Sequence, residues 1–224
     1  IESWKDCTVQ TSLEDLHGLS PYGGLDLSQV SDLSALALLF HPQDGLEKWT
    51  LWVQFYCPEE NIDTRSKRDR VPYDQWTAKG YIKATPGNVT DYAYIEADII
   101  RLEKLFDLRP IGYDRTFSGA LINNLTEAGI EVIQHGQGYM SMSAPSKEFE
   151  RLILGQEISI LENPVLQWQA QHVSTVSDPA GNIKPDKSKV KETGKRIDGI
   201  VAGVMALGVA LANEEDPEAM MEVW

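Results

Sequence analysis

The fold of this chain is decided by the stretch Gly23-Gly-Leu-Asp-Leu-Ser-Gln-Val-Ser-Asp-Leu-Ser-Ala-Leu-Ala-Leu-Leu-Phe40. Within it, an apolar run at 25–27 and a longer one at 33–40 are separated by polar turn residues. A third β-prone run, 49–56, follows the turn sequence Pro42-Gln-Asp-Gly45. Short apolar runs joined by such turns are typical of consecutive antiparallel strands. We therefore predict a three-stranded antiparallel meander that begins the central sheet.

Beyond the meander, helix-like and strand-like segments alternate. The expected helices lie at 58–79 (interrupted at Pro72), 92–106, 119–128, 145–154, 164–170 and 196–212. The expected strands lie at 81–84, 110–113, 130–134 and 172–177, with one more after the turn at 178–182. Antiparallel strands followed by this alternation indicate a mixed α/β domain. We predict a ribonuclease H-like (retroviral-integrase-like) mixed sheet flanked by helices.

Length and composition are those of one globular domain. The chain has 224 residues, of which 42% are hydrophobic and 24% charged, which is enough for one substantial core. We expect a linker or lead-in segment at 1–22, the ribonuclease H-like domain at 23–213 and an acidic tail at 214–224. Because Ile1 begins in mid-sequence, we expect a domain excised from a longer polypeptide.

The cysteines and the apolar segments indicate neither a disulfide framework, nor a zinc site, nor a membrane span. Cys7 and Cys57 lie far apart without a CxxC pattern, which favours a reducing, cytoplasmic setting. The strongest apolar stretch, 200–212, is shorter than the roughly 20 residues that cross a bilayer. We interpret it as a buried helix and expect no membrane partner.

Three aspartates, Asp26, Asp114 and Asp198, each adjoin a short apolar run. We expect Asp26 and Asp114 at strand ends and Asp198 in the first turn of the last helix, where the helix dipole favours a carboxylate. Carboxylates on rigid elements suit Mg²⁺ or Mn²⁺. We predict that these acids hold two such ions in a phosphodiester-cleaving site, with Asp26 as the bridging ligand. Asp32 is an auxiliary ligand or an outer-shell group.

Each of these acids also has an ordinary structural interpretation. Asp26 could be a strand-end acid, and Asp114 and Asp198 could be helix caps. For Asp32, a turn or capping role agrees with the sequence as well as metal ligation does.

Positive charge is concentrated at 184–196, although the formal net charge of the chain is −14. Six basic residues lie in this segment against Asp186 and Glu192. Such runs are usually solvated faces, but this one leads directly into Asp198. Lys and Arg neutralise DNA phosphates, so we predict DNA contacts in this segment. The predicted DNA-binding residues are Lys187, Lys189, Lys191 and Arg196.

Several motifs together resemble the nuclease half of the large terminase subunit of tailed double-stranded DNA bacteriophages. They extend over about residues 22–212, and their order along the chain makes the resemblance specific. The motifs are Gly24-Leu-Asp-Leu-Ser-Gln-Val-Ser-Asp-Leu-Ser-Ala35, Val71-Pro-Tyr-Asp-Gln-Trp76, Thr85-Pro-Gly-Asn88, Tyr113-Asp-Arg115, Gln137-Gly-Tyr139, Asn163-Pro-Val-Leu-Gln-Trp168, Asp178-Pro-Ala-Gly-Asn182 and Arg196-Ile-Asp-Gly-Ile-Val-Ala202.

The resemblance implies an endonuclease that cuts concatemeric viral DNA during genome packaging, with two Mg²⁺ or Mn²⁺ ions, in the host bacterial cytoplasm. It maps the metal-binding acids of the family onto Asp26, Asp114 and Asp198, and a further acid onto Asp32. The implied partners are double-stranded DNA, the portal protein, the small terminase subunit and the ATPase domain of the same polypeptide. The family's ATP-binding glycine-rich loop is absent from this sequence, so we expect no ATP hydrolysis by this chain.

Two other functions agree with parts of the sequence. An actin-like ATPase also carries an acid on its first strand, but its phosphate loop needs glycines, and 26–31 has none. A non-catalytic docking module of the packaging motor, in which the acids are structural, is favoured slightly by the net charge. An assay of metal-dependent plasmid cleavage distinguishes the nuclease from the ATPase and from the docking module.

Overall fold

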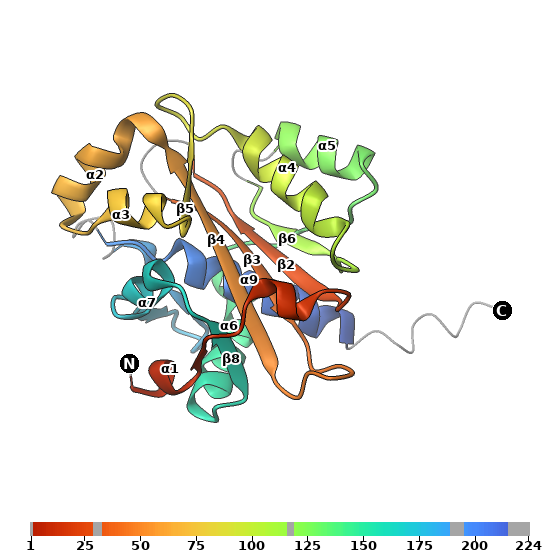
Figure 1. Ribbon diagram of the computed structural model, residues 1–224. Coiled ribbons are helices and arrows are strands. Elements are labelled where there is room, and N and C mark those ends of the chain that lie inside the picture. Colours follow the sequence, from red (N-terminus) through yellow and green to blue (C-terminus); the bar gives the residue numbers. More distant parts are fainter. Residues whose placement is uncertain (1, 29–32, 116–118, 189–194, 215–224) are drawn as a thin grey trace.

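The computed structural model describes residues 2–28, 33–115, 119–188 and 195–214 (Figure 1). Its centre is a mixed eight-stranded sheet with the order β1-β8-β4-β3-β2-β6-β7, in which β5 also pairs with β4. The strands of this sheet are β1 (Thr8–Val9), β2 (Pro21–Asp26), β3 (Ser34–Phe40), β4 (Trp49–Pro58), β5 (Ile82–Thr85), β6 (Ile111–Tyr113), β7 (Val132–Gln134) and β8 (Ile158–Leu161). A separate antiparallel hairpin is formed by β9 (Thr175–Ser177) and β10 (Ile183–Pro185).

Helices cover both faces of the sheet (Figure 1). The α-helices are α1 (Glu2–Asp6), α2 (Ile62–Asp69), α3 (Tyr73–Ala78), α4 (Tyr92–Glu103), α5 (Gly119–Glu127), α6 (Tyr139–Leu154), α7 (Pro164–Ala170) and α9 (Asp198–Glu214). Two short 3-10 turns are η1 (Leu13–Leu16) and η2 (Glu59–Asn61). No helix in the described part of the chain is both long and apolar enough to cross a membrane.

The predicted meander is confirmed. Strands β2, β3 and β4 pair antiparallel in chain order. Every residue of β3 is buried, and successive side chains point to opposite faces of a strand. Ala35 and Ala37 therefore belong to the core cluster that contains α6, α7 and α9, whereas Leu36 and Leu38 belong to the cluster that contains α4 and α5. The continuous apolar run reflects a central strand that is covered on both sides.

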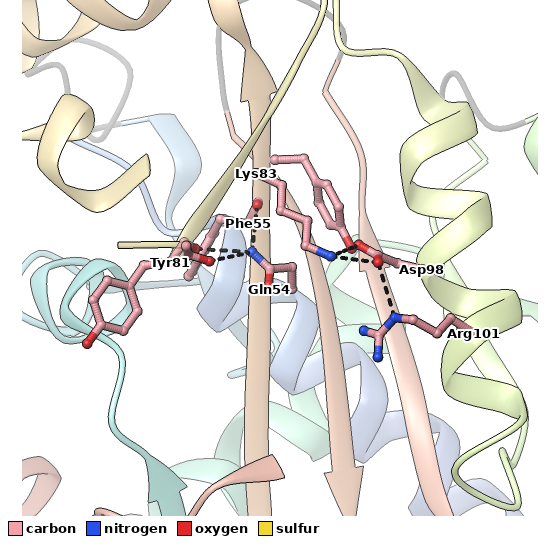
Figure 2. Close-up of polar contacts among 8 residues, drawn as sticks. Gln54, Phe55, Tyr81, Lys83, Asp98 and Arg101 are labelled. Atoms are coloured by element: carbon pink, nitrogen blue, oxygen red, sulfur yellow. Dashed lines mark hydrogen bonds and ion pairs between the residues drawn. The ribbon is translucent and has the colours of Figure 1, made fainter. Parts of the chain in front are cut away.

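The face that carries α4 contains a charged cluster around the buried side chain of Asp98 (Figure 2). Asp98 of α4 accepts hydrogen bonds from the Tyr56 hydroxyl (2.8 Å) and from Lys83 Nζ (2.6 Å). Arg101 Nε lies 3.7 Å from the same carboxylate. Burial raises the pKa of Tyr56 well above its ordinary value, and the charge of Asp98 acts in the same direction. The cluster therefore fastens α4 to β4 and β5 on the face of the sheet opposite α9.

Residues 2–22, which we expected to be a linker or lead-in segment, are part of the folded domain. Strand β1 pairs in parallel with β8, with Thr8 opposite Ile160, and the side chains of Trp4 and Leu16 are buried. The prediction was wrong because β1 has only two residues, which is too short for an alternating pattern. Its partner β8 was not expected either.

Helix α6 also differs from the prediction. It begins at Tyr139, and Pro145 lies inside it, although we expected the helix to begin at that proline. Proline is favoured in the first turn of a helix, so the sequence alone favours a start at Pro145. Residue 214 ends α9, and the rest of the expected acidic tail lies outside the described residues.

Candidate functional site

Asp26 and Asp114 lie at the same end of the sheet, at the carboxyl ends of two neighbouring strands. Strands β2 and β6 are parallel neighbours, with Gly24 opposite Gly112 and Leu25 opposite Tyr113. The next residue in this register is Asp26 on one strand and Asp114 directly after the other. Asp26 is only 4% exposed, whereas Asp114 is partly buried. The parallel register thus brings together two acids that are far apart in the sequence.

Helix α9 lies directly on these two strands because they carry glycines. A Cβ atom at Gly24 would overlap with the carbonyl oxygen of Ala202 and lie 2.8 Å from the backbone nitrogen of Ala206. A Cβ atom at Gly112 would lie 2.7 Å from Cγ2 of Val209. A side chain at Gly24 would overlap with the helix backbone and displace α9, whereas one at Gly112 would overlap with the Val209 side chain.

The direction of α9 places its first residue, Asp198, toward the end of the sheet that carries Asp26 and Asp114. Near the C-terminal end of the helix, Val209 packs with Tyr22 at the start of β2, whereas Ala202 lies against Gly24 further along that strand. The helix therefore runs opposite to β2, and Asp198, one turn before Ala202, lies toward the end that carries Asp26. Asp198 is 5% exposed, and the helix dipole favours its carboxylate form.

The first turn of α9 is fixed by α7. The backbone N–H of Gly199 donates to Oε1 of Gln169 (2.8 Å), and Gln169 is completely buried. Helix α7 is in turn capped by Asn163, whose side-chain oxygen accepts from the N–H groups of Val165 (3.0 Å) and Leu166 (3.2 Å). The position of Asp198 thus rests on a rigid pair of helices.

A lysine and a glutamine hold the carboxylate of Asp26. Lys187 Nζ lies 2.6 Å from Oδ2 and 2.8 Å from Oδ1 of Asp26. The amide nitrogen of Gln137 donates to Oδ1 (2.9 Å), and Lys187 also donates to Gln137 Oε1 (3.0 Å). We call these three residues the Asp26 triad. Since Lys187 follows the β9–β10 hairpin and Gln137 follows β7, three separate parts of the chain meet at Asp26.

A cavity of about 280 Å³ opens beside the Asp26 triad. Gln137 and Lys187 line it together with Tyr139 and Lys184. The ammonium group of Lys184 lies 4.9 Å from the centre of the Tyr139 ring and donates to the carbonyl oxygen of Gln137 (3.3 Å). The cavity therefore has two lysines in its wall, together with one acid, Asp186, and the lysines are the groups that could contact a phosphate.

The predicted acids share one end of the sheet, but they do not form a closed metal cage. Within residues 2–28, 33–115, 119–188 and 195–214, no three His, Cys, Asp or Glu side chains are grouped so that they could hold an ion. The oxygens around Asp26 nevertheless suit a cation, because two carboxylate oxygens and one amide oxygen already surround Lys187 Nζ. Oxygen ligands of this kind are those that Mg²⁺ and Mn²⁺ prefer.

The remaining predicted residues differ in where they lie. Asp32, Lys189 and Lys191 lie outside the described residues. Arg196 is inside the protein: its side chain is 6% exposed, and its guanidinium lies 4.0 Å from the buried carboxylate of Asp69. A DNA contact by Arg196 therefore finds no support in this structure. Lys187 is the DNA-binding candidate that lies within the site.

The sequence did not single out Gln137 as a partner of Asp26. It lies between two glycines, three residues after the end of β7, and β7 is the neighbour of β6, the strand that precedes Asp114. A polar residue at the carboxyl end of a strand that neighbours an acid-bearing strand is the signal that could have identified it.

Comparison with known proteins gives consistent matches. A family model described as "Terminase large subunit, endonuclease domain" matches residues 1–214. The large terminase subunit of Enterobacteria phage HK97 is 37% identical over 191 residues, which are 84% of this chain and 37% of that protein. Its crystal structure matches with a TM-score of 0.79 at 33% identity, over 92% of this chain and 42% of that chain.

Two further relatives are more distant. Protein YmfN of Escherichia coli (strain K12) is 26% identical over an alignment of 228 residues, covering 96% of this chain and 49% of that protein. The large terminase nuclease from thermophilic phage G20c, solved with bound magnesium, has a TM-score of 0.51 at 10% identity, over 93% of this chain and 96% of that chain. These likenesses confirm the predicted ribonuclease H-like fold. The chain spans less than half the length of both curated relatives.

Proposed function

Because the chain belongs to the family of terminase large subunit endonuclease domains, we propose that it is a metal-dependent DNA endonuclease that cuts concatemeric viral DNA during genome packaging. The observation that carries the proposal is the buried carboxylate of Asp26 at the end of β2, which lies in register with Asp114 after β6 and already binds a cation, the ammonium of Lys187.

The proposed metal ligands are the three acids, with Asp26 between the other two and Asp32 as an auxiliary group. Bound magnesium in the nuclease of phage G20c supports a divalent ion, and we propose two Mg²⁺ or Mn²⁺ ions. When bound, such ions supply an activated water and neutralise charge on the leaving 3′ oxygen.

The chain's own residues prepare the site for this chemistry. The packing of α9 on β2 and β6 keeps Asp198 and Asp26 on rigid elements. Metal ligands must be held on such elements if the geometry of the site is to be fixed. Lys184 and Lys187, in the wall of the cavity, lie where they can neutralise a phosphate of the bound strand. We further propose that Lys189 and Lys191 extend this phosphate contact.

The proposed partners follow from the family relationship. They are double-stranded DNA, the portal protein, the small terminase subunit and an ATPase domain on the same polypeptide, and the proposed location is the cytoplasm of the host bacterium. The HK97 relative is named as a large terminase subunit and is longer than this chain, which supports a place within a packaging motor.

The test is cleavage of supercoiled plasmid with Mn²⁺ or Mg²⁺. Asp26→Asn and Asp198→Asn should each lower the cleavage rate by at least about 100-fold, because loss of even an outer-shell partner of a metal ligand costs about 10–100-fold. EDTA should abolish cleavage by the unmodified chain.

Asp44→Asn is the matched control, since Asp44 is an exposed turn residue in the β3–β4 connection. It should cleave at the rate of the unmodified chain. Undiminished cleavage by both site variants would contradict the assignment and favour a structural role for the acids.

A further inference from the structure

Lys187 fills the position of a cation at Asp26. Its Nζ atom contacts both carboxylate oxygens and Gln137 Oε1 at 2.6–3.0 Å. These three acceptors match the three N–H donors of a lysine ammonium. Gln137 also donates to Asp26, so carboxylate, ammonium and amide are all joined to one another by hydrogen bonds.

Burial explains why Asp26 needs this partner. The aspartate is 4% exposed, and a buried carboxylate without a compensating charge is strongly unfavourable. Lys187 supplies that charge directly, since its Nζ lies 2.6 Å from the carboxylate. The Asp26–Lys187 pair is consequently neutral, so the charge of Asp26 that would attract a divalent cation is already balanced.

A divalent ion and the lysine compete for the same oxygens. Mg²⁺ binds carboxylate oxygens at roughly 2.0–2.1 Å, so an ion on Asp26 would occupy the space next to the ammonium and repel it. The ammonium and a divalent ion cannot both contact the two oxygens of Asp26 at the same time.

The side chain of Lys187 has space to move away from Asp26. Its side chain is 33% exposed, and it lines the cavity of about 280 Å³ beside the Asp26 triad. A lysine side chain is a flexible four-carbon stem, so its ammonium can swing into the cavity without a shift of the backbone.

We propose that Lys187 is a built-in counter-ion that regulates metal loading: it holds Asp26 in the metal-free protein and must be displaced before a divalent cation binds there. The inference rests on the proposed function, because it requires Asp26 to be a metal ligand. It adds that the affinity of Asp26 for a divalent cation is set by competition with the Lys187 ammonium.

The test is the affinity for Mn²⁺, measured by calorimetry or electron paramagnetic resonance on the full chain without DNA. Lys187→Met should bind Mn²⁺ at least about fivefold more tightly than the unmodified chain, the lower end of the usual range for coupling between two ligands. Lys184→Met is the matched control. It removes the same charge from the same cavity but no contact with Asp26, so its Mn²⁺ affinity should stay within about twofold of the unmodified chain.

A second measurement needs no variant. With an amine-reactive reagent and mass spectrometry, labelling of Lys187 in the unmodified chain should increase several-fold when Mg²⁺ is added. Labelling of Lys147, an exposed lysine, serves as the internal reference and should not change.

Equal or weaker Mn²⁺ binding by Lys187→Met, or unchanged labelling of Lys187, would overturn the counter-ion proposal while leaving the nuclease proposal intact. A gain of equal size in Lys184→Met would also overturn it, because it would show general electrostatics rather than displacement. If the unmodified chain binds no Mn²⁺ and Asp26→Asn behaves identically, both proposals fail.

Discussion

At the scale of single residues, His135 shows how closely α9 is packed. A Cβ atom at Gly208 of α9 would overlap with Nε2 of the His135 ring, so the ring occupies the space that the missing side chain leaves. Burial lowers the pKa of His135 below its ordinary value of 6.5, while the neighbouring backbone and the charge of Asp114 act in the opposite direction. The folded protein therefore favours the neutral ring.

This shift predicts acid sensitivity. Between the lowered pKa of the folded state and the unfolded value of 6.5, the unfolded chain binds the proton and the folded chain does not. The free energy of unfolding should therefore fall as the pH drops below 6.5, by up to about 1.4 kcal/mol per pH unit. Urea unfolding in EDTA between pH 7.5 and pH 5.5 measures it.

His135→Gln is the control, since it cannot titrate. Its unfolding free energy should depend less on pH in this range. An equal pH dependence in both proteins would show that His135 is not the responsible group.

At this scale the sequence predicts the acids of the proposed site but not the groups that contact Asp26. Asp26 and Asp198 stand out because strand ends and helix starts are local signals. The hydrogen bonds from Gln137 and Lys187 to Asp26 join positions 111 and 161 residues apart. Such separations leave no spacing pattern, so Lys187 was predicted only as a DNA contact.

At the scale of elements, the contact of α9 with β2 positions the proposed site. The small residues Ala35 and Ala37 of β3 lie in the same core cluster as α9, and Gly24 gives the backbone contact. We predict that Gly24→Ala lowers the free energy of unfolding by about 3 kcal/mol, because the overlap is with backbone and cannot be relieved by a rotamer change. Chemical denaturation measures the loss.

Gly119→Ala is the matched control for that substitution. Gly119 begins α5, is exposed, and has no atom within 4 Å of an added Cβ. Its replacement should leave stability unchanged or raise it by up to about 1 kcal/mol. If the two variants were equally stable, the close approach of α9 to β2 would be refuted.

Elements with strong periodicity were predicted, whereas the short strands β1 and β8 were not. The meander, α4, α5 and α7 follow from apolar spacing and turn residues. Strand β8 has four residues and is defined by parallel pairing with both β1 and β4, which come from distant parts of the chain. Its sequence alone, Ile-Ser-Ile-Leu, does not distinguish a strand from the end of a helix.

At the scale of the whole molecule, the N-terminal segment closes one edge of the sheet. Helix α1 brings Trp4, which is 7% exposed, into the core cluster shared with α6 and α9. We predict that Trp4→Ala lowers the free energy of unfolding by about 3–5 kcal/mol. Thermal or urea unfolding of the full chain measures this.

Lys5→Ala, in the same helix but exposed, should change stability by no more than about 0.5 kcal/mol. If Trp4→Ala were as stable as this control, residues 2–9 would behave as the linker that their sequence suggested.

The place of α9 in the chain sets the order in which the proposed site can form. Asp26 lies on an early strand, whereas Asp198 belongs to the last described helix, and that helix covers Gly24 and Gly112. A ribosome-bound chain that lacks α9 can therefore pair β2 with β3 but cannot bring Asp198 to Asp26. The proposed site should therefore be incomplete in a nascent chain until α9 has been synthesised and packed on β2.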